Sequence, residues 1–233
     1  RGLLHGDRGK KQAGMTELGF EVVEVVADRF AAAPQLLARI RVRETSGAVV
    51  HAMALRAQVM VEPQRRPYTE DESSGFLDQF GERARWKDTL RPFLWTFAST
   101  MVTGFTGEHT FDLPIPCTYD MEVTASKYLH ALHNGAVPIR LLFSGTVFTR
   151  GRAENPTARG ISVEQISWSL EATHELPVSI WRELMDHFYP DAGWIRLDRD
   201  SINALVRYKG ERALSTWGEV VSTLLDGSRA VVP

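Results

Sequence analysis

Strict alternation of apolar and polar residues constrains the fold of this chain more than any other feature. Residues 38–43 interleave arginines with apolar side chains, in the order Ala38, Arg39, Ile40, Arg41, Val42, Arg43. Residues 53–61 repeat the pattern around Arg56. Because successive side chains of a strand point to opposite faces, both segments place apolar groups on one face and guanidinium groups on the other. The pattern predicts a half-buried antiparallel sheet.

The turn residues at 45–47 predict that these two segments pair as a β-hairpin. The hairpin would align one set of side chains in a cationic face: Arg39, Arg41, Arg43 and Arg56. Such a face could hold carboxylates through paired hydrogen bonds, which makes it a candidate protein-binding surface. The alternative is a solvated face that the arginines share with acidic neighbours such as Glu44 and Glu62.

Further strand-like segments, separated by glycine and proline turns, cover 95–102, 109–115, 117–125, 137–149, 161–168 and 172–176. A capping box from Thr69 to Glu72 predicts a short inserted helix. After Pro177 the apolar spacing changes to about 3.6 residues, which predicts helices, with Asp198 and the pair Thr216 and Glu219 as caps.

We therefore expect a mainly β protein: an antiparallel β-sandwich with a short inserted helix and a C-terminal helical segment. Residues 1–15 would be a disordered N-terminal tail, 16–176 the sandwich body, and 177–226 helices packed on that body.

Composition argues against several function classes. The 233 residues carry a net charge of −2 and are 43% hydrophobic. This balance disfavours a nucleic-acid or membrane-surface binder. No apolar run reaches the roughly 18 residues that a membrane helix needs. The single cysteine, Cys117, cannot form an intramolecular disulfide, so we expect a cytoplasmic protein.

The histidines offer a candidate metal site. His130 and His133 have the spacing H-x-x-H, and His109 and Cys117 could supply further ligands to nickel or zinc. The alternative is a solvated helix end. Cys117 could instead act as a nucleophile beside a histidine, or be buried as a small apolar group. No phosphate-binding glycine loop is present in the sequence, and we expect no cofactor.

Several strings resemble an uncharacterised family of actinobacterial proteins of unknown function, over about residues 18–226. They are EPQRR at 62–66, RPFLW at 91–95, PCTYD at 116–120, SKYLHAL at 126–132, LLFSGTVF at 141–148 and LPVSIWREL at 176–184. The family is associated with gene clusters for [NiFe]-hydrogenases. The resemblance thus implies an accessory role beside a hydrogenase subunit or maturation factor, and it implies no catalytic residues.

Three functions remain open. The first, which we favour, is a non-enzymatic binding or assembly protein with a protein partner. The second is an enzyme that uses Cys117 with a histidine, or a metal bound by histidines. The third is a carrier of a small apolar ligand, in a cavity lined by Phe143, Phe148 and Met121. The oligomeric state is left open.

Overall fold

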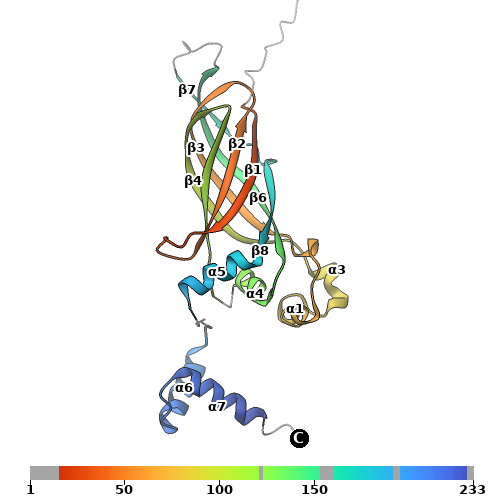
Figure 1. Ribbon diagram of the computed structural model, residues 1–233, viewed down its shortest axis with the longest axis vertical. Helices are drawn as coiled ribbons and strands as arrows, with labels where there is room; N and C mark the ends of the chain where they lie inside the picture. The colour runs from red at the N-terminus through yellow and green to blue at the C-terminus, as the bar shows by residue number, and fades with distance from the viewer. Residues whose placement is uncertain (1–15, 121–122, 153–159, 191–194, 230–233) are drawn as a thin grey trace, which may run out of the picture. The chain divides into compact units, whose positions relative to one another are not determined.

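The computed structural model describes residues 16–120, 123–152, 160–190 and 195–229 (Figure 1). The chain divides into two compact units, Arg1–Gly193 and Trp194–Pro233, which we call unit 1 and unit 2. Each unit is described by itself. The predicted tail at 1–15 and Met121 lie outside the described residues.

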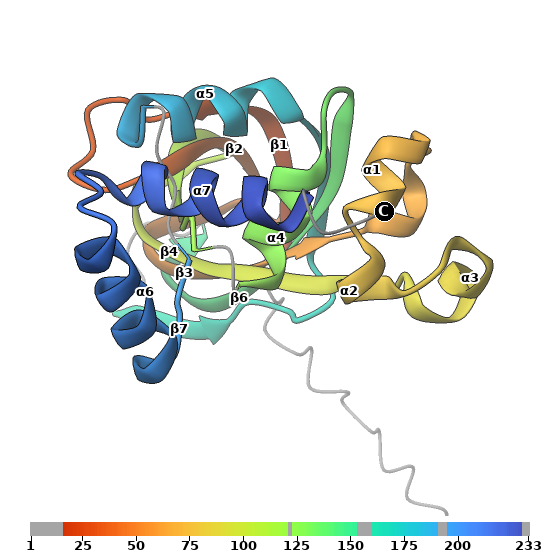
Figure 2. The ribbon, with the colours of Figure 1, turned by 90° about the horizontal axis from the view of Figure 1, so that it is seen from below.

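Unit 1 contains two antiparallel sheets that face each other (Figures 1 and 2). The three-stranded sheet has the order β1 (Leu18–Ala27), β2 (Gln35–Glu44), β5 (Glu108–Pro116). The five-stranded sheet has the order β4 (Phe93–Thr106), β3 (Ala48–Val61), β6 (Ala136–Arg152), β7 (Ile161–Gln165), and β8 (Glu171–Pro177) also pairs with β6. Strands β4 and β5 lie side by side at one edge, and β1 and β8 at the other. The predicted antiparallel sandwich is confirmed.

The core lies between the sheets and follows the alternation read from the sequence. Leu36, Ala38, Ile40 and Val42 of β2 are fully buried, and the alternate residues of β3 face them. The rings of Phe20 and Phe143 stack across the interior with centroids 4.3 Å apart. The strands approach most closely at Gly145, where a Cβ atom would lie 2.1 Å from the carbonyl oxygen of Ala54. Only glycine fits there.

The predicted hairpin between the first two alternating segments is wrong. β2 pairs with β1 and β5, whereas β3 pairs with β4 and β6. Both strands are central, so each takes two long neighbours from elsewhere in the chain, and residues 45–47 lead from one sheet to the other. Alternation determines which face of a strand is buried, but it does not select the strand's partners.

Short helical segments surround one end of the sheets (Figure 2). They are η1 (Pro63–Arg65), α1 (Glu70–Ser74), α2 (Leu77–Phe80), η2 (Arg83–Arg85), α3 (Trp86–Thr89), α4 (Thr124–Ala131) and α5 (Val178–Phe188). The predicted capping box begins α1, because the Thr69 side chain accepts from the Glu72 amide and the Glu72 carboxylate accepts from the Thr69 amide. α5 packs on β1, β2, β8 and α4 through the buried Trp181.

The strand predicted over 117–125 is wrong where the structure describes it, since Thr124 and Ala125 begin α4. The buried residues of this region, Ala125, Tyr128, Leu129 and Leu132, have the spacing of one helical face. That spacing was present in the sequence, but the shorter alternation just before it suggested a strand.

Unit 2 consists of α6 (Arg199–Glu211) and α7 (Trp217–Arg229). Both predicted caps are confirmed: the Asp198 carboxylate accepts from the Ser201 amide, and Thr216 and Glu219 bond reciprocally. The division of the chain at Gly193 places α5 in unit 1. For α6 and α7, packing on the body stays a prediction. In the described part of the chain, no helix has the length and apolar character needed to cross a membrane.

Candidate functional site

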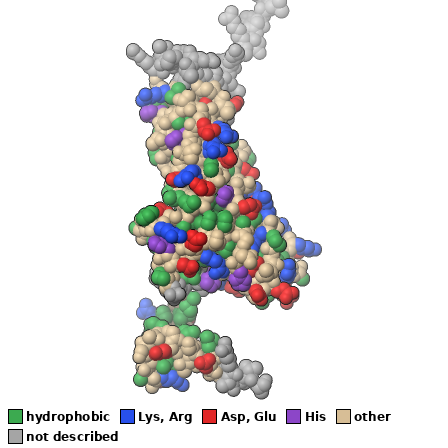
Figure 3. Space-filling model, viewed as in Figure 1, with side chains coloured by type: hydrophobic (Ala, Val, Ile, Leu, Met, Phe, Trp, Pro, Cys, Tyr) green, Lys and Arg blue, Asp and Glu red, His purple; other side chains and the backbone are tan. Residues whose placement is uncertain are grey.

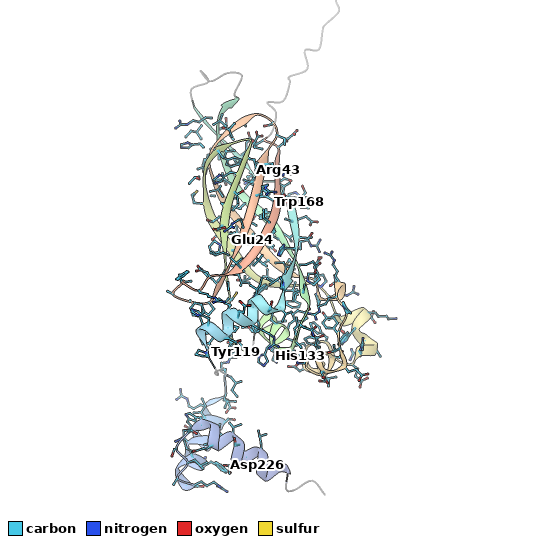
Figure 4. All side chains as sticks on the ribbon, viewed as in Figure 1. Glu24, Arg43, Tyr119, His133, Trp168 and Asp226 are labelled. Carbon is cyan, nitrogen blue, oxygen red and sulfur yellow. The ribbon has the colours of Figure 1, made fainter. Side chains whose placement is uncertain are left out.

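The three arginines of β2 lie on the outer face of the three-stranded sheet, where carboxylates of both neighbouring strands meet them (Figures 3 and 4). The ion pairs are Arg39 with Glu24 and with Asp112 (3.3 Å), Arg41 with Glu21 (3.0 Å) and Glu108 (3.4 Å), and Arg43 with Glu108 (2.7 Å). We call this set the arginine ladder. Its positive charge is balanced within the sheet itself, so the ladder is not an open cationic surface.

Arg56 does not join the ladder. It lies on β3 in the other sheet, where its guanidinium carbon sits 4.1 Å from the ring centroid of Phe97. The predicted face of four arginines therefore does not form, because it depended on a hairpin that the fold does not contain. Binding of a protein by any of these arginines stays a prediction.

The four predicted metal ligands occupy separate environments. His109 on β5 stacks on Phe105 with centroids 5.5 Å apart. Cys117 follows β5, and its thiol donates to the carbonyl of Ile115 at 3.5 Å. Nδ1 of His130, on α4, lies 3.4 Å from the hydroxyl oxygen of Tyr119. His133 lies two residues after the end of α4. Within the described residues, no three His, Cys, Asp or Glu side chains gather in a way that could hold a metal ion.

The acid–base state of Cys117 bears on the thiol-enzyme hypothesis. Burial raises the pKa of its thiol to about 12, against a smaller opposing effect of a hydrogen bond from the Leu36 backbone. The thiol is therefore protonated at neutral pH, whereas nucleophiles and metal ligands need the thiolate. Burial, with the nearby charge of Arg182, also lowers the pKa of His130. The environment of Cys117 favours its interpretation as a small, partly buried apolar group.

Phe143 and Phe148, two of the three residues predicted to line an apolar cavity, lie on opposite faces of β6. Phe143 is buried in the core against Phe20, with its side chain on the same face of β6 as Val147. Phe148 follows Val147 directly, so its side chain lies on the opposite, outer face, in register with Ala52. Met121 lies outside the described residues. The carrier hypothesis thus loses the arrangement on which it was based.

A buried ion pair, which the sequence did not indicate, joins η1, α1 and the end of α4. The side chains of Arg66 and Glu72 are 7% and 1% exposed, and Nη2 of Arg66 lies 3.0 Å from Oε1 of Glu72. Burial opposes ionisation of Glu72, but hydrogen bonds from the amides of His133 and Thr69, together with the charge of Arg66, hold the pKa of this carboxyl below its usual value. Glu72 is therefore ionised at neutral pH.

The capping box did predict Glu72 at the start of α1, but only as a surface cap. Its burial depends on His133, 61 positions away, and on Arg66, which forms no periodic pattern with it. The pair also lines a pocket of about 260 Å³. No local spacing of residues in the sequence could have predicted this site.

The helices of unit 2 leave apolar side chains uncovered. Among the described residues of unit 2, the one fully buried apolar side chain is Val220. The exposed residues include Ile202 and Val206 on α6, with 45% and 51% of their surface exposed, and Val221 and Leu224 on α7, with 51% and 40%. We call these four residues the apolar stripes of unit 2.

Comparisons with known proteins give a family and no activity. No curated protein matches the sequence. Among solved structures, a β-glucosidase from Kluyveromyces marxianus is similar at a TM-score of 0.23 and 8% identity, over 69% of this chain and 15% of that chain. So low a score carries no argument. A family model matches residues 15–232, which confirms the expected resemblance to a family of unknown function. The chain belongs to the family of unknown function DUF6084.

Proposed function

We propose that this chain is a non-enzymatic binding or assembly protein that docks a protein partner through the apolar stripes of unit 2. The observation that carries the proposal is the exposure of Ile202, Val206, Val221 and Leu224 within a unit that fully buries one apolar side chain among its described residues.

The energetics of burial support this function. Full burial of a Val, Leu or Ile side chain contributes roughly 1.5–3 kcal/mol. Because these four side chains are about half exposed, covering each one contributes roughly half of that before the entropy of association is counted. A unit of two short helices is too small to build a core of its own from these residues. Ile202 and Val206 are four positions apart, and Val221 and Leu224 are three apart, so each pair presents one helical face. This is the spacing by which amphipathic helices enter apolar grooves.

The identity of the partner forms the second part of the proposal. The resemblance to a family associated with [NiFe]-hydrogenase gene clusters suggests a hydrogenase subunit or a maturation factor. This part rests on association and is separate from the docking surface, so the two parts need separate tests.

The test uses the full chain and a double variant, Val206→Asp with Leu224→Asp. Wild type and variant are mixed with a purified [NiFe]-hydrogenase large subunit and its maturation proteins, and binding is measured by biolayer interferometry. We expect wild type to bind and the variant to bind at least tenfold more weakly. The double control Asn203→Asp with Ser222→Asp adds the same two charges at exposed polar positions beside the stripes and should leave binding unchanged.

Two results would contradict the parts separately. If wild type binds none of these proteins, the hydrogenase connection fails. If a photo-crosslinker placed at Val206 of the full chain captures no other protein in cells of the source organism, docking through the stripes fails. Far-UV circular dichroism checks that the variants keep their helices.

A further inference from the structure

The pocket beside the buried ion pair has the chemistry of a binding site. Its volume is about 260 Å³, and the lining residues that matter here are Arg66, Tyr68, Thr69, Glu72, Asn134 and Ala136. They come from the segment before α1, from α1 itself, and from the turn that leads into β6. The pocket belongs to unit 1 and is independent of the docking proposed for unit 2.

The guanidinium of Arg66 is held in place on several sides. Its Nη2 donates to Glu72 at 3.0 Å and to the Asn134 carbonyl at 3.1 Å, and its Nε donates to the Pro67 carbonyl at 3.2 Å. Its central carbon lies 5.1 Å from the centroid of the Tyr68 ring. The remaining nitrogen, Nη1, is buried and has no hydrogen-bond partner among the described residues. A buried donor without a partner is unfavourable, and an incoming acceptor would remove that penalty.

Apart from Oδ1 of Asn134, the side-chain acceptors around the pocket are already engaged. Both carboxylate oxygens of Glu72 receive hydrogen bonds. The hydroxyl of Tyr68 donates to the Pro63 carbonyl at 2.6 Å and is bonded to Tyr128, and burial raises the pKa of Tyr68 to about 12. A ligand that brought donors would find little to accept them.

Donors, by contrast, are in surplus. The Thr69 hydroxyl accepts from the Glu72 amide and donates to no group in the described structure. The side-chain amide of Asn134, on an exposed turn, forms no hydrogen bond there either. Together with Nη1 of Arg66, these groups call for a ligand rich in acceptors.

We propose that this pocket binds a small organic carboxylate, which accepts from Arg66 Nη1, the Thr69 hydroxyl and the Asn134 amide. A single negative charge suits the site, because the ionised Glu72 already balances Arg66 and would repel a dianion such as phosphate. Ala136 and the ring of Tyr68 supply apolar contact for the carbon chain of the ligand.

The experiment titrates the ¹⁵N-labelled full chain with propionate at constant ionic strength and follows the Nε–Hε resonance of Arg66 by NMR. We expect a saturable shift of this resonance, with that of Arg182 unchanged. Propionamide, which has the same shape without the charge, should bind at least tenfold more weakly, and phosphate should give no saturable shift. No response to propionate, or an equal response to propionamide, phosphate or chloride, would overturn the proposal.

Two variants test whether propionate binds in this pocket. Ala136→Leu fills the pocket, and Asn134→Asp replaces a donor by a negative charge on an exposed turn, so each should weaken propionate binding at least tenfold. Gln64→Asp makes the same change of charge at an exposed residue that does not line the pocket, and should bind as wild type does. If Ala136→Leu fails to fold, Asn134→Asp decides. Wild-type affinity in the folded variants would contradict the assignment.

Discussion

The arginine ladder and the Arg66–Glu72 pair use the same two chemical groups in opposite surroundings. In the ladder, Arg39 and its partners Glu24 and Asp112 are each close to half exposed. Arg66 and Glu72 are almost completely buried, and the carboxylate accepts two further backbone hydrogen bonds. Water can replace either partner of a ladder pair, whereas the buried pair meets solvent only at the pocket that it lines.

This difference in exposure determines how much each set of ion pairs contributes to the stability of the fold. Exposed ion pairs typically stabilise a fold by about 0–1 kcal/mol, because solvent screens the attraction and two flexible side chains lose freedom. Removing one member of a buried pair leaves an uncompensated charge in the interior, which costs far more than the pair itself provides. The ladder is therefore tolerant of change, whereas the buried pair requires both of its members.

The largest effect should come from Glu72→Gln. The variant leaves Arg66 buried without a counter-charge. In either orientation of the new amide, its NH₂ faces a donor, which is the Thr69 amide on one side or the His133 amide on the other. We expect the free energy of unfolding to fall by about 3–5 kcal/mol, measured by urea denaturation. Glu70→Gln, on the exposed side of the same helix, serves as the control and should change it by less than about 0.5 kcal/mol. If both variants lost the same free energy of unfolding, the buried charge would contribute no more to stability than the exposed one.

The pH dependence should sharpen the same comparison. Because the folded protein lowers the pKa of Glu72 from its ordinary value of 4.5, this group stabilises the fold above pH 4.5, and the contribution is lost as the pH falls through the folded pKa. Wild type and Glu72→Gln should therefore differ most near pH 6, and the difference should shrink as the pH falls below 4.5 and through the folded pKa. Urea denaturation across this range measures the gap, and a gap independent of pH would contradict the assignment.

A further ion pair, that of Glu62, is intermediate in burial between the ladder and the Arg66–Glu72 pair. The Glu62 side chain is 6% exposed. Its carboxylate lies 2.7 Å from Nη1 of Arg65 and 2.5 Å from Nη2 of Arg140, whose side chain is 32% exposed. Glu62→Gln should lower the free energy of unfolding by about 1.5–3 kcal/mol, because a charged hydrogen bond is lost at a partly buried site. Glu171→Gln changes the longer, more exposed contact of the same arginine and should have a smaller effect. If Glu171→Gln lowered the free energy of unfolding more than Glu62→Gln does, burial would not determine how much each ion pair contributes.

The smallest effect should be that of Arg39→Ala in the ladder. We expect a loss of about 0.2–1 kcal/mol at low salt. At 1 M NaCl the Debye length is about 3 Å, so the loss should shrink further. Urea denaturation at the two salt concentrations gives the comparison. A salt-independent loss above about 2 kcal/mol would mean that the ladder acts as a buried network.

The sequence predicted well those features that a few neighbouring residues determine. Alternation identified the buried faces of β2 and β3, and the capping boxes located the starts of α1 and α7. The sequence did not predict which distant segments of the chain pair with each other. The hairpin was wrong because β2 and β3 lie in different sheets, where each pairs with two other strands, and α4 was missed because two periodic patterns overlapped near Ala125.

Side-chain periodicity and capping depend on geometry within a turn or a strand, so they could be read directly from the order of residues. The partners of the charged side chains could not. The same arginine becomes part of an exposed ladder or of a buried pair according to which segments pack beside it. Arg66 and Glu72 became a buried pair lining a pocket only when the turn at His133 and Asn134, over sixty positions away, closed around them. Burial of charge is a property of the packed interior, and this is why the tertiary structure alone decided it.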